Sequence, residues 1–90
     1  MELRREIEVT NKLGLHARAA AKLVNLASGF DSDIQLSCNG QSVSAKSIMG
    51  IMMLAAARGS RIEVVTRGPD AVEAMDKIER LFEERFDEDE

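Results

Sequence analysis

The chain has 90 residues, of which 44% are apolar, and this length and composition predict one globular domain with a modest core. Its net charge of −4, the absence of Trp and Tyr and the presence of only three Phe argue against nucleic acid or an anionic membrane as the main partner. The chain has a single cysteine, so no internal disulfide can form, and it has no apolar run of about 20 residues that could span a membrane. Its charged start is unlike a signal peptide. Together these features predict a cytoplasmic protein.

The first elements along the chain are a strand and a helix. Apolar residues at odd positions over 3–10 predict a strand with one buried face. After a connection over 11–15, where Gly14 supplies backbone freedom, apolar residues recur at helical spacing and predict a helix over 17–28, with Gly29 at its C-terminal cap. The buried stripe of this helix is expected to comprise Ala17, Ala20, Ala21, Leu23, Val24 and Ala27.

The middle of the chain has the pattern of a hairpin. Apolar residues alternate with polar ones over 34–38, and the dipeptide Asn39-Gly40 that follows is the strongest short signal for a two-residue hairpin turn. A short returning strand is expected over 41–44, with Val43 turned inward.

Two helices and a strand complete the order. Ser47 is placed to cap a helix over 48–57, and the strand that follows is expected to end near Arg67. Pro69 or Asp70 then starts the last helix. Its apolar stripe is expected to comprise Ala71, Met75, Ile78, Phe82 and Phe86, with Val72, Ala74 and Leu81 beside it.

This order of elements favours a two-layer α+β fold. Strands that alternate in hydrophobicity form a sheet with one covered and one solvated face, so the three helices are expected on a single side. The economical topology places the fourth strand between the first two. We therefore predict an open-faced sandwich with a four-stranded antiparallel sheet, as one domain over 1–90. Its acidic end, residues 87–90, has the composition of a solvated, frayed tail.

The one histidine of the chain, His16, stands directly before a predicted helix. A neutral imidazole, whose ordinary pKa is about 6.5, is a good nucleophile for a phosphoryl group. The helix N-terminus offers unpaired N–H groups and a partial positive charge, together worth about 0.3–1 kcal/mol toward an anion. Arg18 adds a guanidinium that can bind phosphate oxygens with two hydrogen bonds. These features suit a phosphoryl site, but the spacing alone favours an ordinary histidine N-cap beside a solvated arginine.

Two segments resemble a known family. The sequence GLHAR at 14–18 resembles the active-site motif of the HPr phosphocarriers of the phosphoenolpyruvate-dependent phosphotransferase system, and SIMG at 47–50 resembles a second signature of that family. The resemblance covers essentially the whole chain. It implies that His16 accepts the phosphoryl group on Nδ1 and that Arg18 clamps it. The family usually has proline at the position of Ala19. Because alanine restricts the backbone less than proline, the sequence does not determine how stiff the His16 turn is or how fast transfer occurs.

The resemblance implies a carrier that its partners consume and regenerate. Enzyme I would phosphorylate His16, and enzyme IIA components would take the group onward in sugar uptake or in nitrogen-related regulation, with the carrier as a monomer. No acid–base pair or phosphate-cradling glycine loop accompanies His16, so the chain is not expected to be an enzyme in its own right. No metal or cofactor is expected, because His16 and Cys38 are single residues far apart in the sequence.

The motifs divide between two branches of the family. The segments at 29–31, 61–64, 68–69 and 86–89 resemble the nitrogen-related NPr branch, whereas the segment at 47–50 resembles the sugar-transport branch. A nitrogen-type regulator and a single general-purpose HPr both fit this mixture.

The predicted second helix carries apolar residues on every side. Only about half of its circumference can face the sheet, which predicts an exposed, methionine-rich patch able to bind several partners. For any single methionine of this helix, the alternative is that its side chain is buried and fills a core that has few aromatic residues. The family docks its partners through this helix and the first one, which implicates Ala21, Ile48, Met49 and Met52.

Ser47 is expected to act as a helix N-cap worth about 1 kcal/mol. It also resembles the serine that some HPr proteins present to a regulatory Ser kinase/phosphorylase. A phosphate on Ser47 would add negative charge beside the docking patch. An alternative function from another class is therefore a regulatory binding module switched by phosphorylation at Ser47, without phosphoryl relay.

Overall fold

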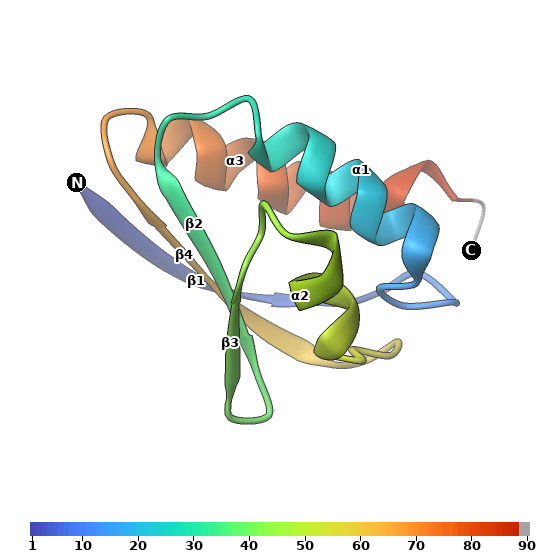
Figure 1. Cartoon of the computed structure of the whole chain (residues 1–90). Helices are drawn as coiled ribbons and strands as arrows, with labels where there is room; N and C mark the ends of the chain where they lie inside the picture. The colour runs from blue at the N-terminus through green and yellow to red at the C-terminus, as the bar shows by residue number, and fades with distance from the viewer. Residues whose placement is uncertain (89–90) are drawn as a thin grey trace.

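A computed structural model of the chain describes residues 1–88. Three helices lie on one side of a four-stranded antiparallel sheet, and the other face of the sheet is open, as predicted (Figure 1). The elements in chain order are β1 (Glu2–Glu8), α1 (Ala17–Ala27), β2 (Asp33–Cys38), β3 (Gln41–Ser44), α2 (Ile48–Met53), β4 (Arg61–Arg67), α3 (Ala71–Glu83) and a 3-10 turn, η1 (Arg85–Asp87).

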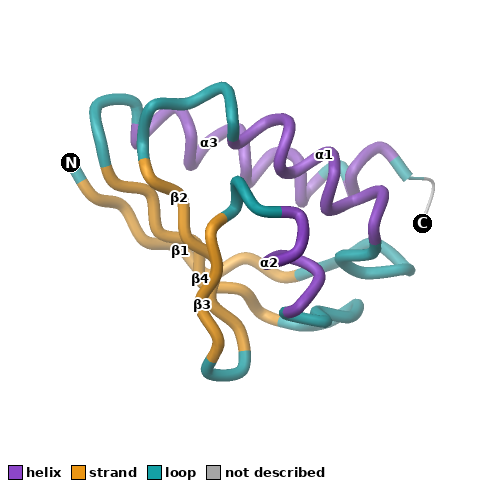
Figure 2. The backbone as a smooth tube through the Cα atoms, viewed as in Figure 1, coloured by secondary structure: helices purple, strands orange, loops and turns teal. Residues whose placement is uncertain are grey.

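The strand order is β1-β4-β2-β3, with every neighbouring pair antiparallel. The fourth strand therefore lies between the first two, which confirms the predicted topology. The hairpin prediction is also confirmed, because Asn39 and Gly40 both take positive φ angles, 52° and 81°, and join β2 directly to β3 (Figure 2).

The core lies between the sheet and the helices. Side chains on alternate positions of β2 and β4, such as Ile34, Leu36, Ile62 and Val64, face α1 and α3 and are fully buried or nearly so. The two largest core side chains, Phe82 and Phe86, meet edge to face with their ring centroids 4.9 Å apart.

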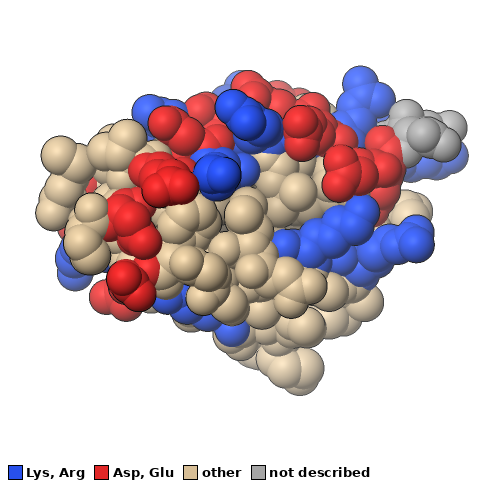
Figure 3. All heavy atoms as spheres, turned by 90° about the horizontal axis from the view of Figure 1, so that it is seen from above, with Lys and Arg blue, Asp and Glu red and all other residues tan. Residues whose placement is uncertain are grey.

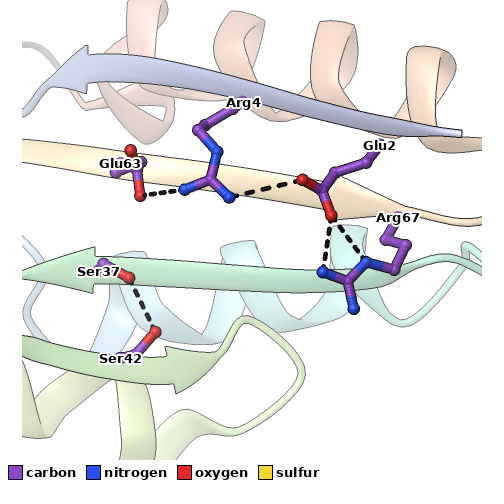
Figure 4. A network of polar contacts seen from close by, with 6 residues as sticks. All are labelled: Glu2, Arg4, Ser37, Ser42, Glu63 and Arg67. Atoms are coloured by element: carbon purple, nitrogen blue, oxygen red, sulfur yellow. Dashed lines mark hydrogen bonds and ion pairs between the residues drawn. The ribbon is translucent and has the colours of Figure 1, made fainter.

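The open face of the sheet carries charges that pair across strands. Arg4 on β1 donates to Glu63 on β4 at 3.0 Å, and Glu2 accepts two hydrogen bonds from Arg67, the shorter at 2.6 Å (Figure 4). The Arg67 guanidinium lowers the pKa of Glu2 below its usual range. Much of the charge on this face is therefore compensated within the sheet itself.

The buried stripe of α1 differs from the predicted one. Ala19 is fully buried, Ala17 is exposed, and Ala21 and Val24 are only half-buried. Alanine occurs on both the buried and the exposed sides of α1, so the alanine positions do not by themselves mark the face that turns to the core. Its C-cap is also Ser28, and not Gly29 as predicted.

The second helix is shorter than predicted. It ends at Met53, because Leu54 is its C-cap and Ala55 takes a left-handed φ of 50°. This reversal turns Leu54 and Ala56 into the core, where both are 4% exposed. Helix propensity favoured continuing to residue 57, but burial of these two side chains outweighs it.

Asp70 links the start of α3 to the loop before β2. Its side chain does not cap α3; it accepts hydrogen bonds from the backbone N–H groups of Asp31 and Ser32, both at 2.9 Å, and from the Ser32 hydroxyl. The Ser32 hydroxyl, followed by the Asp31 N–H, lowers the pKa of Asp70 below its ordinary value.

This lowered pKa predicts a pH dependence of stability. A carboxylate whose pKa is lower in the folded state stabilises the protein fully above its unfolded pKa of about 3.9, and that contribution is lost as the pH falls through the folded pKa. Asp70→Asn should therefore lower stability at neutral pH and reduce the loss of stability between about pH 5 and pH 2. Urea unfolding across this range measures both effects, with Asp33→Asn on an exposed strand residue as the control. Equal pH slopes in Asp70→Asn and the unmodified protein would contradict the prediction.

Candidate phosphoryl-transfer site

His16 is the N-cap of α1, as predicted from its position. Its backbone is extended, with φ −73° and ψ 178°, and its carbonyl accepts the first hydrogen bond of the helix, from Ala20 at 2.8 Å. Its ring atom Nδ1 accepts a hydrogen bond from the backbone N–H of Arg18 at 3.3 Å. The His16 side chain is 27% exposed, so part of it remains open to solvent.

The loop before His16 is fixed by its contacts with the segment after α2. The Leu15 N–H donates to the carbonyl of Ala56 at 2.9 Å. Gly14 has a φ of 68°, and a Cβ at this position would lie 2.5 Å from the same carbonyl oxygen. Only glycine therefore allows the loop to lie this close to the chain, and the early end of α2 helps to place His16.

Glu88 lies against the other nitrogen of the imidazole. Its Oε2 atom is 2.5 Å from His16 Nε2, and its Oε1 atom accepts from the amide of Asn11 at 3.1 Å. The Glu88 side chain is only 15% exposed. The interpretation of residues 87–90 as a solvated tail is therefore wrong for Glu88, while residues 89–90 lie outside the described part of the chain.

Phe86 explains why the end of the chain lies here. It is fully buried, and its carbonyl accepts a hydrogen bond from Lys22 Nζ on α1 at 2.6 Å. These contacts hold η1 against α1 and direct Glu88 toward His16. The sequence signal for this placement was the continuation of the apolar stripe of α3 into Phe86, just before the acidic residues.

Two opposing effects set the pKa of Glu88. Partial burial raises it, but the hydrogen bonds from the Asn11 amide and the His16 ring, together with the charges of His16 and Lys22, outweigh burial and lower the pKa below its usual value. Glu88 is therefore a carboxylate at neutral pH.

His16 opens onto a hollow of about 310 Å³ whose other lining residues are Lys12, Leu13, Arg18 and Glu88. Arg18 and Lys12 bring two positive charges to this hollow and Glu88 brings one negative charge, so the lining keeps a net positive charge, which suits an anionic group of small size. Arg18 was predicted at this site, whereas Lys12 was not, because nothing in its local sequence marks it. A larger hollow, of about 820 Å³, lies at Met1 and the start of α3, away from His16.

The exposed side chains of α2 form an apolar surface, the α2 patch, defined by Ile48, Met49, Met52 and Met53. Met49 is the most exposed at 71%, and within α2 only Ile51 is buried. The patch lies beside α1, which packs against α2. Seen from above the helices, charged side chains gather over the upper half and the two sides of the molecule, and the lower centre of the view is uncharged (Figure 3). Ala21 on α1 is half-buried, and Leu13 in the loop before His16 adds an exposed apolar side chain that was not predicted.

Comparison with known proteins gives the family. The family model described as "PTS HPr component phosphorylation site" matches residues 3–84. The chain belongs to the HPr family. It is 54% identical to the phosphocarrier protein HPr of Cupriavidus necator, over 98% of this chain and 99% of that protein. It is 42% identical to the phosphocarrier protein NPr of Escherichia coli, over 99% of this chain and 100% of that protein.

A solved structure of the family has the same fold. HPr-C-His from Thermoanaerobacter tengcongensis superposes with a TM-score of 0.94 at 41% identity, covering 98% of this chain and 99% of that chain. The match to relatives named HPr and NPr agrees with the mixed branch motifs. These relatives are phosphocarrier proteins of the phosphotransferase system, so the family role is that of a carrier.

The described residues, 1–88, contain neither a cluster of metal-ligating side chains nor a membrane-spanning helix. No three His, Cys, Asp or Glu side chains in this part of the chain lie close enough together to hold a metal ion. No helix within it is long and apolar enough to cross a membrane.

Proposed function

We propose that this member of the HPr family accepts a phosphoryl group on His16 Nδ1 from phosphorylated enzyme I and passes it to enzyme IIA components. The observation that carries the proposal is the position of Nδ1, which faces the N-terminal N–H groups of α1 as a hydrogen-bond acceptor. An acceptor nitrogen holds a lone pair, and a lone pair is what attacks phosphorus.

The surroundings suit both forms of such a carrier. Before transfer, the Arg18 N–H binds the Nδ1 lone pair weakly, at 3.3 Å. After transfer, the N-terminus of α1 and the guanidinium of Arg18 would face the phosphoryl oxygens. Because the hollow is open to solvent on one side, this stabilisation stays moderate, as a group that must be passed on requires.

We propose the α2 patch, with Ala21 and Arg18, as the docking surface for enzyme I and the enzyme IIA components. Flexible methionine side chains adapt to differently shaped partners, and the exposed apolar area lies on the helix that packs beside α1. Docking on this patch would bring a partner's phosphoryl group to the exposed part of His16.

We also propose that Ser47 has two roles: it caps α2, and its phosphorylation regulates the binding of partners. Its hydroxyl accepts a hydrogen bond from the Gly50 N–H at 3.0 Å and so caps α2. Ser47→Ala should lower the free energy of unfolding by about 1 kcal/mol, measured by urea denaturation, whereas Ser47→Asp should keep the cap and the stability. Ser47→Asp also places negative charge beside the α2 patch and should weaken binding to enzyme I. Unchanged stability in Ser47→Ala would contradict the capping role.

Incubation with enzyme I and phosphoenolpyruvate tests the proposed function. Intact-mass analysis should show one added phosphoryl group that is lost in acid, as phosphohistidine is. Phosphorylated protein is then offered separately to a sugar-type and a nitrogen-type enzyme IIA, and transfer to either one identifies the branch. Absence of the adduct, or an adduct that neither acceptor removes, would overturn the proposal.

A further inference from the structure

The His16 ring has two polar partners that require the same proton arrangement. The Arg18 backbone N–H can only donate, so Nδ1 must be the ring nitrogen without a proton. The Glu88 carboxylate can only accept, so the neutral ring must carry its proton on Nε2. Both contacts therefore select the Nε2–H tautomer, which leaves the lone pair on Nδ1.

The Glu88 carboxylate is itself held in place. The Asn11 amide uses its two hydrogens on Glu88 Oε1 and on the Gly14 carbonyl, at 3.1 and 2.8 Å, so one buried side chain joins Glu88 to the His16 loop. On the other side, buried Phe86 anchors the chain two residues earlier. With both carboxylate oxygens engaged, Glu88 has a defined position relative to the imidazole.

We infer that Glu88 is a positioning residue for phosphoryl transfer, which holds the imidazole in the Nε2–H form and stabilises the positive charge that the ring acquires during the step. This inference rests on the proposed function of His16. It concerns a residue outside both sequence signatures and assigns a role to the acidic end of the chain.

The Nδ1 lone pair forms the N–P bond while the bond between phosphorus and the donor's leaving atom breaks, and that electron pair stays with the donor. The proton on Nε2 does not move, so the ring, with phosphorus on one nitrogen and hydrogen on the other, becomes positively charged. Glu88 faces this charge at Nε2, as a carboxylate faces the imidazolium of a catalytic triad. In the onward step, the next acceptor attacks phosphorus, the N–P bond breaks, and its electron pair returns to Nδ1, for which the charged ring is a good leaving group.

The ring state can be tested before any transfer occurs. Nitrogen-15 NMR of the full chain above about pH 8, where an imidazole is mostly neutral, should show a proton on Nε2 that is shifted downfield and slow to exchange. Glu88→Ala should remove that shift, and Glu83→Ala, which deletes an exposed glutamate of α3, should retain it. A ring protonated on Nδ1, or an Nε2 proton unaffected by Glu88→Ala, would overturn the inference whether or not the protein is a phosphocarrier.

Transfer kinetics test whether Glu88 stabilises the positive charge that the ring acquires. Glu88→Gln has one acceptor oxygen in place of two, so it can accept from Nε2–H only by giving up the hydrogen bond from the Asn11 amide. The NMR signal should persist in weakened form, whereas loss of the negative charge should lower kcat for transfer from enzyme I by about tenfold. A tenfold decrease is smaller than the effect of removing a buried hydrogen bond to a transition state, because the Glu88 side chain is partly solvated. Glu88→Asp should recover part of the rate, and Glu83→Gln should transfer normally. Rates equal to those of Glu83→Gln, or a change confined to KM, would overturn the role.

Discussion

Replacing His16 by alanine is expected to abolish phosphorylation by enzyme I and phosphoenolpyruvate completely. His16 is the only histidine of the chain, so no second imidazole can take the group. The fold should survive, because the side chain is partly exposed and its one capping bond, at 3.3 Å, is long. Intact-mass analysis after incubation gives the result directly, and circular dichroism confirms that the variant is folded.

Arg18→Ala is the control for this variant. It removes a positive charge from the same hollow but leaves Nδ1 and the backbone N–H in place, so phosphorylation should be slower and still occur. An acid-labile adduct that persists in His16→Ala would contradict the assignment of the acceptor.

Phe82→Ala is expected to lower the free energy of unfolding by about 3–5 kcal/mol, a large part of the total stability of a domain of this size. Phe82 is 1% exposed, and its ring packs edge to face on Phe86. Its loss leaves a cavity between α3 and the sheet and removes an aromatic contact. Urea denaturation monitored by circular dichroism measures the change.

Phe30→Ala is the matched control, because it makes the same truncation at a phenylalanine that is only partly buried at the edge of the core. It should cost clearly less than Phe82→Ala. Equal costs at the two positions would mean that the core does not centre on the Phe82–Phe86 pair.

The order of elements and the position of His16 were predictable because local patterns determine them. Alternation over 34–38 and the Asn39-Gly40 turn act within a few residues, and the N-cap position of His16 follows from the start of one helix. The α2 patch was also predictable, because a helix without polar residues cannot bury its whole circumference.

The remainder of the site depends on contacts between distant positions. Glu88 and Asn11 are 77 residues apart, and no local pattern connects an acidic residue near the end of the chain to an asparagine in the first loop. The early end of α2 was missed for a related reason. Ala55 leaves the helix because Leu54 and Ala56 pack into the core. The alanine-rich sequence does not show which of these residues will be buried.

The contact between Glu88 and His16 joins positions 72 residues apart, close to the full span of the described chain. A polypeptide emerging from the ribosome therefore presents the histidine long before it presents the carboxylate. The Nε2 contact of His16 therefore forms only after the last part of the described chain has been made and Phe86 has packed against the core, so the ordered imidazole is a late product of folding.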